Sequence, residues 1–393
     1  MASVMTQAVR LGTDVLLSST RLRGKRVGIV CNHASVDLGF AHIVDRLAAA
    51  DGVTLGAIFG PQHGFRSDVQ DNMIETPHRD DPGRRVPVYS LYSETREPTA
   101  DMVRDLDALV VDLQDIGARI YTYIYTMANC LRAGARHGVP VIVCDRPNPI
   151  NGVDVEGAAL VPGYESFVGQ FPIPMRHGMT MGELARLFNA HFRLGATLEV
   201  VKMEGWRREM FADETGLPWV MPSPNMPTLD TAVVYPGTVL FEGTLLSEGR
   251  GTTRPFELLG APGIEAERFA QQLNASGLPG VFFRPAVFEP TFQKHAKQAC
   301  AGCQIHVTDW RAFKPVLTGA ALIGAFHRAA PGTPLWRQPP YEYEHEKLPI
   351  DILSGSPRFR EQIEAGMSAT AMADSWHRDE EAFKALRGPF LLY

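Results

Sequence analysis

The stretch from Leu109 to Tyr125, which reads LVVDLQDIGARIYTYIY, most constrains the fold of this chain. It lies in an apolar run from Leu106 to Leu113 that only Asp107 and Asp112 interrupt. A run this short, rich in Val and Leu, is typical of a strand covered on both faces, as in a parallel sheet. Polar and aromatic side chains follow at once: Asp112, Gln114, Asp115, Arg119, Tyr121, Tyr123 and Tyr125. Because open α/β sheets bind ligands beyond the carboxyl ends of their strands, we expect a site here.

Strand-like and helix-like segments alternate through the first half of the chain. The expected strands are 27–31, 53–59, 87–91, 107–113, 139–144 and 198–203. The expected helices are 43–50, 120–137 and the segment that a capping box of Thr180 and Glu183 opens. This alternation predicts βαβ units and a mostly parallel sheet, and therefore an α/β fold.

The pattern changes beyond residue 256. Helices are expected at 264–273, 313–327, 359–364 and 379–386, and strands at 281–287 and 304–308. We therefore predict two domains: 1–256, carrying the site, and 257–393, a smaller α+β domain. The Pro-dense segment 217–237 is predicted to be a loop over the site, because it keeps Trp219, Asn225 and Tyr235.

Composition excludes several classes of protein. The chain has 393 residues, a formal charge of −6 and no basic run, which argues against nucleic acid as a partner. No apolar stretch approaches the roughly 20 residues that span a bilayer. The N-terminus has neither a basic region nor a sustained apolar core of the kind that opens a secretory signal. With five cysteines, an odd and sparse count, the expected location is the cytoplasm.

Each expected strand end in the first half carries polar residues, and these should converge on one crevice. The strand-end residues are Asn32 and His33, Gln62 and His63, Asp115 to Arg119, and Asp145, Arg146 and Asn148. The acids near this crevice are Asp112, Asp115, Asp145, Glu156, Glu242 and Glu248. Asp115 and Glu248 best fit the carboxyl groups of a glycosidase, since each lies near an arginine in a Gly-containing turn. The alternative is that both form ion pairs that shape loops.

Cofactor motifs are missing from the sequence. The turn after the first strand, VCNHASVD, matches neither G-x-G-x-x-G nor the Walker pattern, and G-x-S-x-G is also absent. Cys300 and Cys303, with His295 and His306 nearby, form one C-x-x-C, which more often packs in a core than binds zinc. We expect no cofactor and no metal.

Ordered motifs along nearly the whole chain resemble one family. They are GKRVGIVCNHAS, FGPQHGFR, PVYSLY, DLQDIGARIYTYIYTM, DRPNPINGVDVEG, SFVGQFPIPMRHGMTMGELA, PWVMPSPNMPTLDTAVVYPGT and LSEGRGTTRPFELLGAP. Together they resemble the exo-β-N-acetylmuramidase family of glycoside hydrolases. The resemblance implies a Rossmann-like domain with an auxiliary domain, and removal of N-acetylmuramic acid from the non-reducing end of peptidoglycan fragments. It also implies a role in wall turnover or recycling, and many relatives are exported.

Two positions depart from the family pattern. The family usually has glutamate, its proposed catalytic carboxylate, where this chain has Gln62, and it has asparagine at Leu245. Glutamine cannot exchange a proton near neutral pH, and loss of a general acid or base typically costs ~10²–10⁴ in rate. With Gln62 present, the acetamido oxygen of the sugar could act as the nucleophile, as in substrate-assisted exceptions. That mechanism needs only one carboxyl acid.

The resemblance assigns roles to the candidate residues. Proton transfer or its orientation would involve His63, Asp115 and Glu248, with Gln62 at the catalytic position. The lactyl carboxylate of the sugar would be bound by arginines from this set: Arg119, Arg146, Arg176 and Arg250. Sugar hydroxyls or the acetamido group would be bound by Asn32, Tyr121, Asn148, His177, Ser223 and Asn225.

Two other hypotheses stay open at this point. A non-catalytic or altered-specificity sugar binder would have kept the pocket and lost the carboxylate at position 62. A nucleotide-dependent sugar-modifying enzyme rests on the fold alone. In either sugar-directed reading the partner is an amino sugar, and no nucleic acid or membrane is expected.

Overall fold

The computed structural model describes residues 8–70, 73–330 and 332–393. The cytoplasmic expectation rests partly on the N-terminal stretch of the sequence. The first seven residues of that stretch lie outside these ranges. In the described part of the chain, no helix is both long and apolar enough to cross a membrane.

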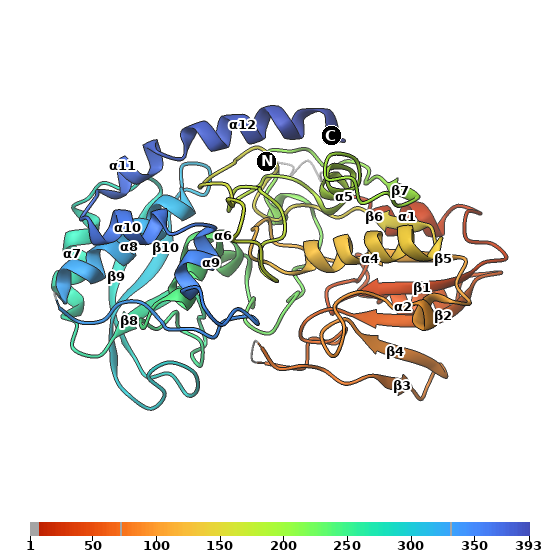
Figure 1. The fold of residues 1–393 in the computed structure, drawn as a ribbon, viewed down its shortest axis with the longest axis horizontal. Coiled ribbons are helices and arrows are strands. Elements are labelled where there is room, and N and C mark those ends of the chain that lie inside the picture. Colours follow the sequence, from red (N-terminus) through yellow and green to blue (C-terminus); the bar gives the residue numbers. More distant parts are fainter. Residues whose placement is uncertain (1–7, 71–72, 331) are drawn as a thin grey trace, which may run out of the picture.

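A seven-stranded sheet forms the first half of the fold (Figure 1). Its strands are β1 (Arg26–Cys31), β2 (Thr54–Gly60), β3 (Arg79–Asp81), β4 (Val86–Ser90), β5 (Ala108–Asp112), β6 (Val141–Cys144) and β7 (Leu198–Val201). They lie in the order β3-β4-β2-β1-β5-β6-β7, and every neighbouring pair except β3 and β4 is parallel. Numbered along the chain, the six parallel strands take the order 3-2-1-4-5-6 of a doubly wound Rossmann sheet. The predicted α/β, Rossmann-like fold is confirmed.

Helices cover both faces of this sheet. They are α1 (Gly12–Leu17), α2 (Ile43–Ala48), α3 (Ala100–Val103), α4 (Tyr123–His137) and α5 (Met181–Ala190), whereas α6 (Leu229–Thr238) packs against elements of the second half of the fold. Leu109 and Val111 of β5 share one core with α4 and α5, whereas Ala108 and Val110 share the other with α1 and α2. Because successive side chains of a strand point to opposite faces, only a continuous apolar run can fill both cores.

A three-stranded antiparallel sheet, in the order β8-β10-β9, forms the second half. Its strands are β8 (Leu258–Ala261), β9 (Val281–Phe288) and β10 (Cys300–Val307). Its helices are α7 (Ala266–Asn274), α8 (Pro315–Ala329), α9 (Pro349–Ser354), α10 (Arg358–Glu364), α11 (Ala369–Asp374) and α12 (His377–Arg387). Short 3-10 helices are Ala212–Glu214, Val239–Gly243 and Gly388–Phe390. The two sheets lie on either side of the predicted boundary at residues 256 and 257, which itself stays a prediction.

The prediction of one loop over 217–237 is wrong in its second part. Residues 217–228 are irregular, but α6 follows them, capped by Thr228, whose hydroxyl accepts a hydrogen bond from Thr231 N (3.3 Å). This helix could not be recognised in the sequence for two reasons. All of its last eight residues are buried, so the segment has no amphipathic period, and Pro236 lies inside it.

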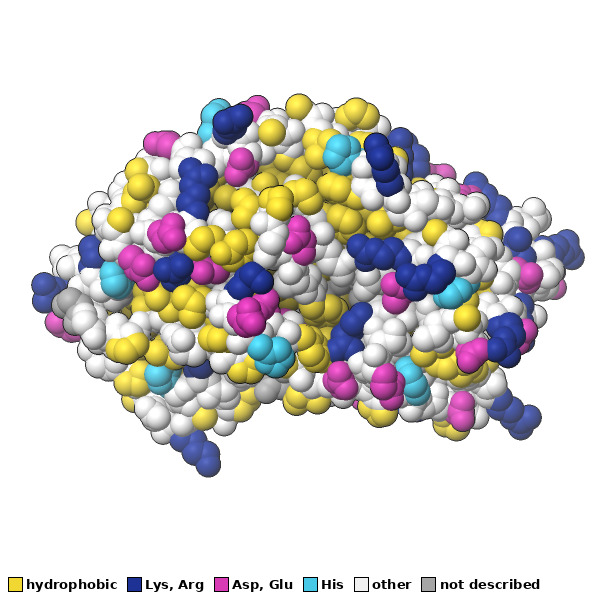
Figure 2. Space-filling model, in the orientation of Figure 1, with side chains coloured by type: hydrophobic (Ala, Val, Ile, Leu, Met, Phe, Trp, Pro, Cys, Tyr) yellow, Lys and Arg dark blue, Asp and Glu magenta, His cyan; other side chains and the backbone are white. Residues whose placement is uncertain are grey.

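The two halves pack together at several places. α6 packs on α8, and α12 runs from the second half back towards α5 and β7 (Figure 1). Arg387 at the end of α12 donates to Val153 O (2.7 Å), and Tyr393 donates to Asp145 Oδ2 (2.8 Å). On the face drawn in Figure 2, basic and acidic side chains are interspersed rather than gathered by sign.

Candidate active site

The carboxyl ends of β1, β5 and β6 meet at one edge of the sheet. Asn32 after β1 donates from Nδ2 to Gln114 O (3.1 Å) and accepts at Oδ1 from Gln114 N (3.4 Å). Gln114 after β5 donates from Nε2 to Pro147 O after β6 (3.1 Å). The loops are thus tied together beside the point between β1 and β5 where the strand order reverses, the usual ligand position of this fold.

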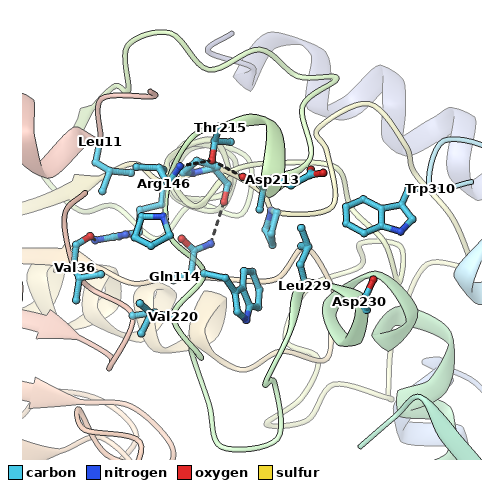
Figure 3. A pocket seen from close by; sticks show the side chains of 17 residues that line it. Leu11, Val36, Gln114, Arg146, Asp213, Thr215, Val220, Leu229, Asp230 and Trp310 are labelled. Carbon is cyan, nitrogen blue, oxygen red and sulfur yellow. Dashed lines mark hydrogen bonds between the residues drawn. The ribbon is translucent and has the colours of Figure 1, made fainter. Parts of the chain in front are cut away.

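A cavity of about 360 Å³ opens at this edge (Figure 3). Apolar side chains, among them Val36, Trp219 and Trp310, make up much of its wall. Arg146 also lines it, but the guanidinium is already paired with the carboxylate of Asp112 and donates to Val36 O (2.9 Å). The cavity has the room and the wall of a binding pocket.

A second cavity, of about 40 Å³, is lined mostly by polar and titratable side chains. It is lined by Gln62, His63, Ile120, Tyr121, Thr122, Tyr123, Val168, Ser223, Asn225, Met226, Tyr235, Glu242, Arg250, Phe256, Tyr341 and Glu342. Residues from both halves of the chain therefore build this small cavity. The irregular segment 217–228 contributes side chains to both cavities. A space of this size holds water but no sugar ring, so the wall must open to admit a sugar.

Gln62 lies two residues beyond the end of β2 and is buried. Its Oε1 accepts a hydrogen bond from the Thr122 hydroxyl (2.9 Å), and its Nε2 donates to Oε1 of Glu342 (3.4 Å). Next to it, His63 adopts a positive φ of 70° and has its Nδ1 2.7 Å from Val69 O. Gln62 therefore bridges the first half of the chain and a carboxyl group of the second half.

Glu342 is only 4 % exposed and lies in the irregular segment between α8 and α9. Its Oε2 accepts a hydrogen bond from the Tyr92 hydroxyl (2.9 Å). Burial raises the pKa of Glu342 to about 7, and the hydrogen bonds from Tyr92 and Gln62 offset only part of this effect. At neutral pH this carboxyl group is protonated in a large share of the molecules.

Glu242 is the second buried carboxyl group of the cavity. Burial alone would raise the pKa of Glu242, but the charge of Arg250 and the hydrogen bond from Tyr341 outweigh it and hold this pKa below its usual range. Arg250 Nη2 lies 2.6 Å from Glu242 Oε1, and the Tyr341 hydroxyl donates to Oε2 (2.7 Å). The cavity thus combines one carboxyl group with a lowered pKa and one with a raised pKa, the pattern of acid–base sites.

Several predicted site residues line this small cavity: Gln62, His63, Tyr121, Ser223, Asn225 and Arg250. Asp115 lies outside its wall, where Oδ2 accepts from Gly117 N (2.8 Å) and lies 3.5 Å from Nε2 of His177. Asn148 bonds Met179 O (3.0 Å), and Asn32 holds the Gln114 loop. The structure therefore places four predicted residues in the loops around the cavity, namely Asp115, His177, Asn148 and Asn32. The roles proposed for them stay predictions.

The other predicted charged residues are occupied by the protein itself. Arg119 donates to Ala158 O (3.0 Å), Ile173 O (2.8 Å) and Leu353 O (2.9 Å). Arg176 pairs with Asp154 (3.2 Å), and Glu248 pairs with Lys294 (2.6 Å). Buried ion pairs, and arginines that donate to backbone carbonyls, hold loops in place. For Glu248 this is the alternative stated above, in which the acid forms an ion pair that shapes a loop.

Sequence reasoning missed Glu342 altogether and gave Glu242 no role. Glu342 stands in YEYEHEK, a segment without strand or helix periodicity, and its neighbours Gln62 and Tyr92 are about 250 or more positions away. A glutamate flanked by two tyrosines was the available signal, but nothing in the sequence linked it to the first half of the chain.

The described residues contain no group of three or more His, Cys, Asp or Glu side chains that could hold a metal ion. Cys300 and Cys303, considered above as zinc ligands, are buried as free thiols on β10.

Comparisons with known proteins agree with this architecture. The family model of the N-terminal part of the exo-β-N-acetylmuramidase NamZ matches residues 27–230, and that of the C-terminal part matches residues 233–393. The peptidoglycan β-N-acetylmuramidase NamZ of Bacillus subtilis (strain 168) is 45 % identical over 387 residues, which cover 98 % of this chain and 91 % of that protein.

Two crystal structures of DUF1343 family proteins from Bacteroides fragilis NCTC 9343 share the fold. One is 36 % identical with a TM-score of 0.89, and the other is 29 % identical with a TM-score of 0.75. Each comparison covers 98 % of this chain and 99 % of the other. The chain belongs to the exo-β-N-acetylmuramidase NamZ family.

Proposed function

We propose that this protein is a glycosidase, an exo-β-N-acetylmuramidase, that removes N-acetylmuramic acid from the non-reducing end of peptidoglycan fragments. The observation that carries the proposal is the 45 % identity to the Bacillus subtilis peptidoglycan β-N-acetylmuramidase over 98 % of the chain. This similarity includes both halves of the chain, and both halves are needed to build the small cavity.

The chemistry of the small cavity supports a hydrolytic role. Hydrolysis of a glycosidic bond needs a carboxyl group that keeps its proton at working pH. Glu342 has that property, and Glu242 supplies a fixed negative charge that can stabilise a developing oxocarbenium ion. Burial also raises the pKa of Tyr121 and Tyr235, so both rings stay neutral and can present a face or a hydroxyl to a sugar.

The lactyl carboxylate of the sugar would meet Arg250, the one predicted arginine in the described wall of the small cavity. Because Arg250 already pairs with Glu242, the substrate would share this guanidinium rather than neutralise a free charge. We also propose a cytoplasmic role in wall turnover or recycling. The five free, buried cysteines are compatible with a reducing compartment, and cell fractionation would check the location.

A chromogenic β-N-acetylmuramide tests the activity. We expect release of the chromophore, and much slower release from the matching β-N-acetylglucosaminide, which lacks the lactyl group. Binding of N-acetylmuramic acid by calorimetry without turnover, together with turnover gained on Gln62→Glu, would contradict the proposal. That result would identify a sugar binder that had lost its catalytic carboxylate.

A further inference from the structure

Glu342 lies where a narrow cavity meets a wider, more open groove. The small cavity is narrow and is lined almost entirely by buried side chains, whereas a wider and more open groove of about 770 Å³ borders it. The groove is lined by Glu75, Ser93, Glu94, Arg96, Glu97, Asn129, Glu165, Ser166, Phe167, Gln170, Glu342, Tyr343 and Glu344. Among the described residues, Glu342 alone lines both.

An exo-acting glycosidase needs this kind of junction. The terminal sugar must be enclosed on one side of the bond that breaks, while the leaving group extends on the other side. The group that protonates the bridging oxygen must therefore stand at the boundary between the two spaces. Glu342 occupies the boundary between the groove and the small cavity, whose wall must open to admit the sugar. Tyr92 and Gln62, both from the first half of the chain, hold it there.

Other groups of the small cavity are less suited to this task. Glu242 is bound through both oxygens, by Arg250 and by Tyr341, and stays ionised. The buried tyrosines hold their protons too tightly, because burial raises their pKa. His63 has its Nδ1 directed to Val69 O and lines the cavity without reaching the groove.

We propose that Glu342 is the proton donor to the glycosidic oxygen, and that Gln62 positions it. This inference rests on the proposed function. The amide of Gln62 carries no charge, so this hydrogen-bond partner does not place a second carboxylate against Glu342. The acid of the reaction thus comes from the second half of the chain, opposite the position where the family usually has glutamate.

Glu342 gives its carboxyl proton to the glycosidic oxygen, and the electron pair of the bond between C1 and that oxygen stays on the oxygen, which departs as an alcohol. The acetamido oxygen of the same sugar bonds to C1, forming a cyclic oxazolinium ion. Water then adds to C1, the acetamido oxygen recovers its electron pair, and the water proton passes to the Glu342 carboxylate. One water is consumed and the donor is restored.

The test compares two leaving groups in Glu342→Gln. A general acid matters most when the leaving alcohol is a poor one, so hydrolysis of a muramyl–N-acetylglucosamine disaccharide should fall by ~10²–10⁴ in kcat/KM. Hydrolysis of a 4-nitrophenyl β-N-acetylmuramide, whose leaving group needs little protonation, should fall much less. Glu346→Gln, an exposed glutamate of the same segment outside both linings, should keep native rates on both substrates.

Native rates on both substrates in folded Glu342→Gln would overturn the inference. So would a loss specific to the disaccharide in His63→Ala and not in Glu342→Gln. Should Glu342→Gln fail to fold, Tyr92→Phe serves instead: it removes a hydrogen bond that lowers the pKa of Glu342, so the alkaline limb of the rate should move to higher pH. An unmoved limb would also overturn the inference. A native protein that cleaves neither substrate contradicts the proposed function itself, and Glu342 as donor falls with it.

Discussion

The amide of Gln62 and the carboxyl group of Glu342, 280 positions apart in the sequence, lie in contact, with 3.4 Å between Nε2 and Oε1. Thr122 fixes the other end of the amide by donating to Oε1 of Gln62 (2.9 Å). The contact joins the two halves of the chain at the small cavity. It also replaces the pair of carboxyl groups that a glutamate at position 62 would form with Glu342.

The rate of hydrolysis should fall as the pH rises above about 7. The pKa of Glu342 is raised from 4.5 to about 7 by burial, so the protonated donor is lost through this range. The charge of Glu242 also raises this pKa, whereas the hydrogen bonds from Tyr92 and Gln62 and the charge of Arg96 lower it. A plot of kcat/KM against pH checks this, and a rate that stays flat to about two units above the pKa would contradict it.

The same group makes stability depend on pH. Because the pKa of Glu342 is higher in the folded state, the folded protein binds a proton more tightly than the unfolded chain does. The contribution of Glu342 is fully present below pH 4.5 and is lost as the pH rises through about 7. Denaturant unfolding of the native protein and of Glu342→Gln should show this loss in the native protein only.

Gln62→Glu should move the alkaline limb of the rate to higher pH. The new carboxylate would lie within about 3.4 Å of Glu342, and two carboxyl groups this close do not both ionise, so one pKa rises. A shift of about one unit or more is expected from that repulsion. Gln338→Glu, an exposed change in the same segment as Glu342, should leave the limb in place.

Arg119→Met should destabilise the fold rather than weaken sugar binding. The guanidinium is fully buried and is the donor to three backbone carbonyls, of Ala158, Ile173 and Leu353. Leaving these acceptors unpaired should cost about 3 kcal/mol or more of unfolding free energy. Chemical denaturation measures the loss, and Arg104→Met, at an exposed position, should stay within about 0.5 kcal/mol of native. A raised KM with native stability would instead restore the sequence-based role.

Gly237→Ala should disrupt the packing of α6 on α8. A Cβ at this position would lie 1.8 Å from Pro315 O and 2.6 Å from Pro315 C, and backbone atoms cannot rotate away. A loss of about 3 kcal/mol or more is expected, with loss of activity, because Tyr235 and Glu242 lie on or next to α6. Thermal unfolding checks this. Gly388→Ala, which has nothing within 4 Å of its Cβ and no positive φ, should unfold like the native protein.

The sequence by itself determined the parallel sheet and the region of the site. The run at Leu109–Val111 can fill two cores only as a strand covered on both faces, so its local composition was sufficient. The polar residues that follow the strands could be read in the same way, which is why Gln62, His63 and Tyr121 were found. Ser223 and Asn225 follow no strand, and their roles came from the resemblance to the family. α6 was not predicted, because a helix that is buried on all sides has no amphipathic period in its sequence.

Only the tertiary structure decided which charged residues face the small cavity. Arg119 and Arg250 look alike in the sequence, yet one meets backbone carbonyls and the other meets Glu242. Glu342 reaches Gln62 and Tyr92 through the packing of the two halves, and that packing also removes it from water and raises its pKa. Burial and proximity between distant segments are properties of the folded chain, and no local pattern of residues encodes them.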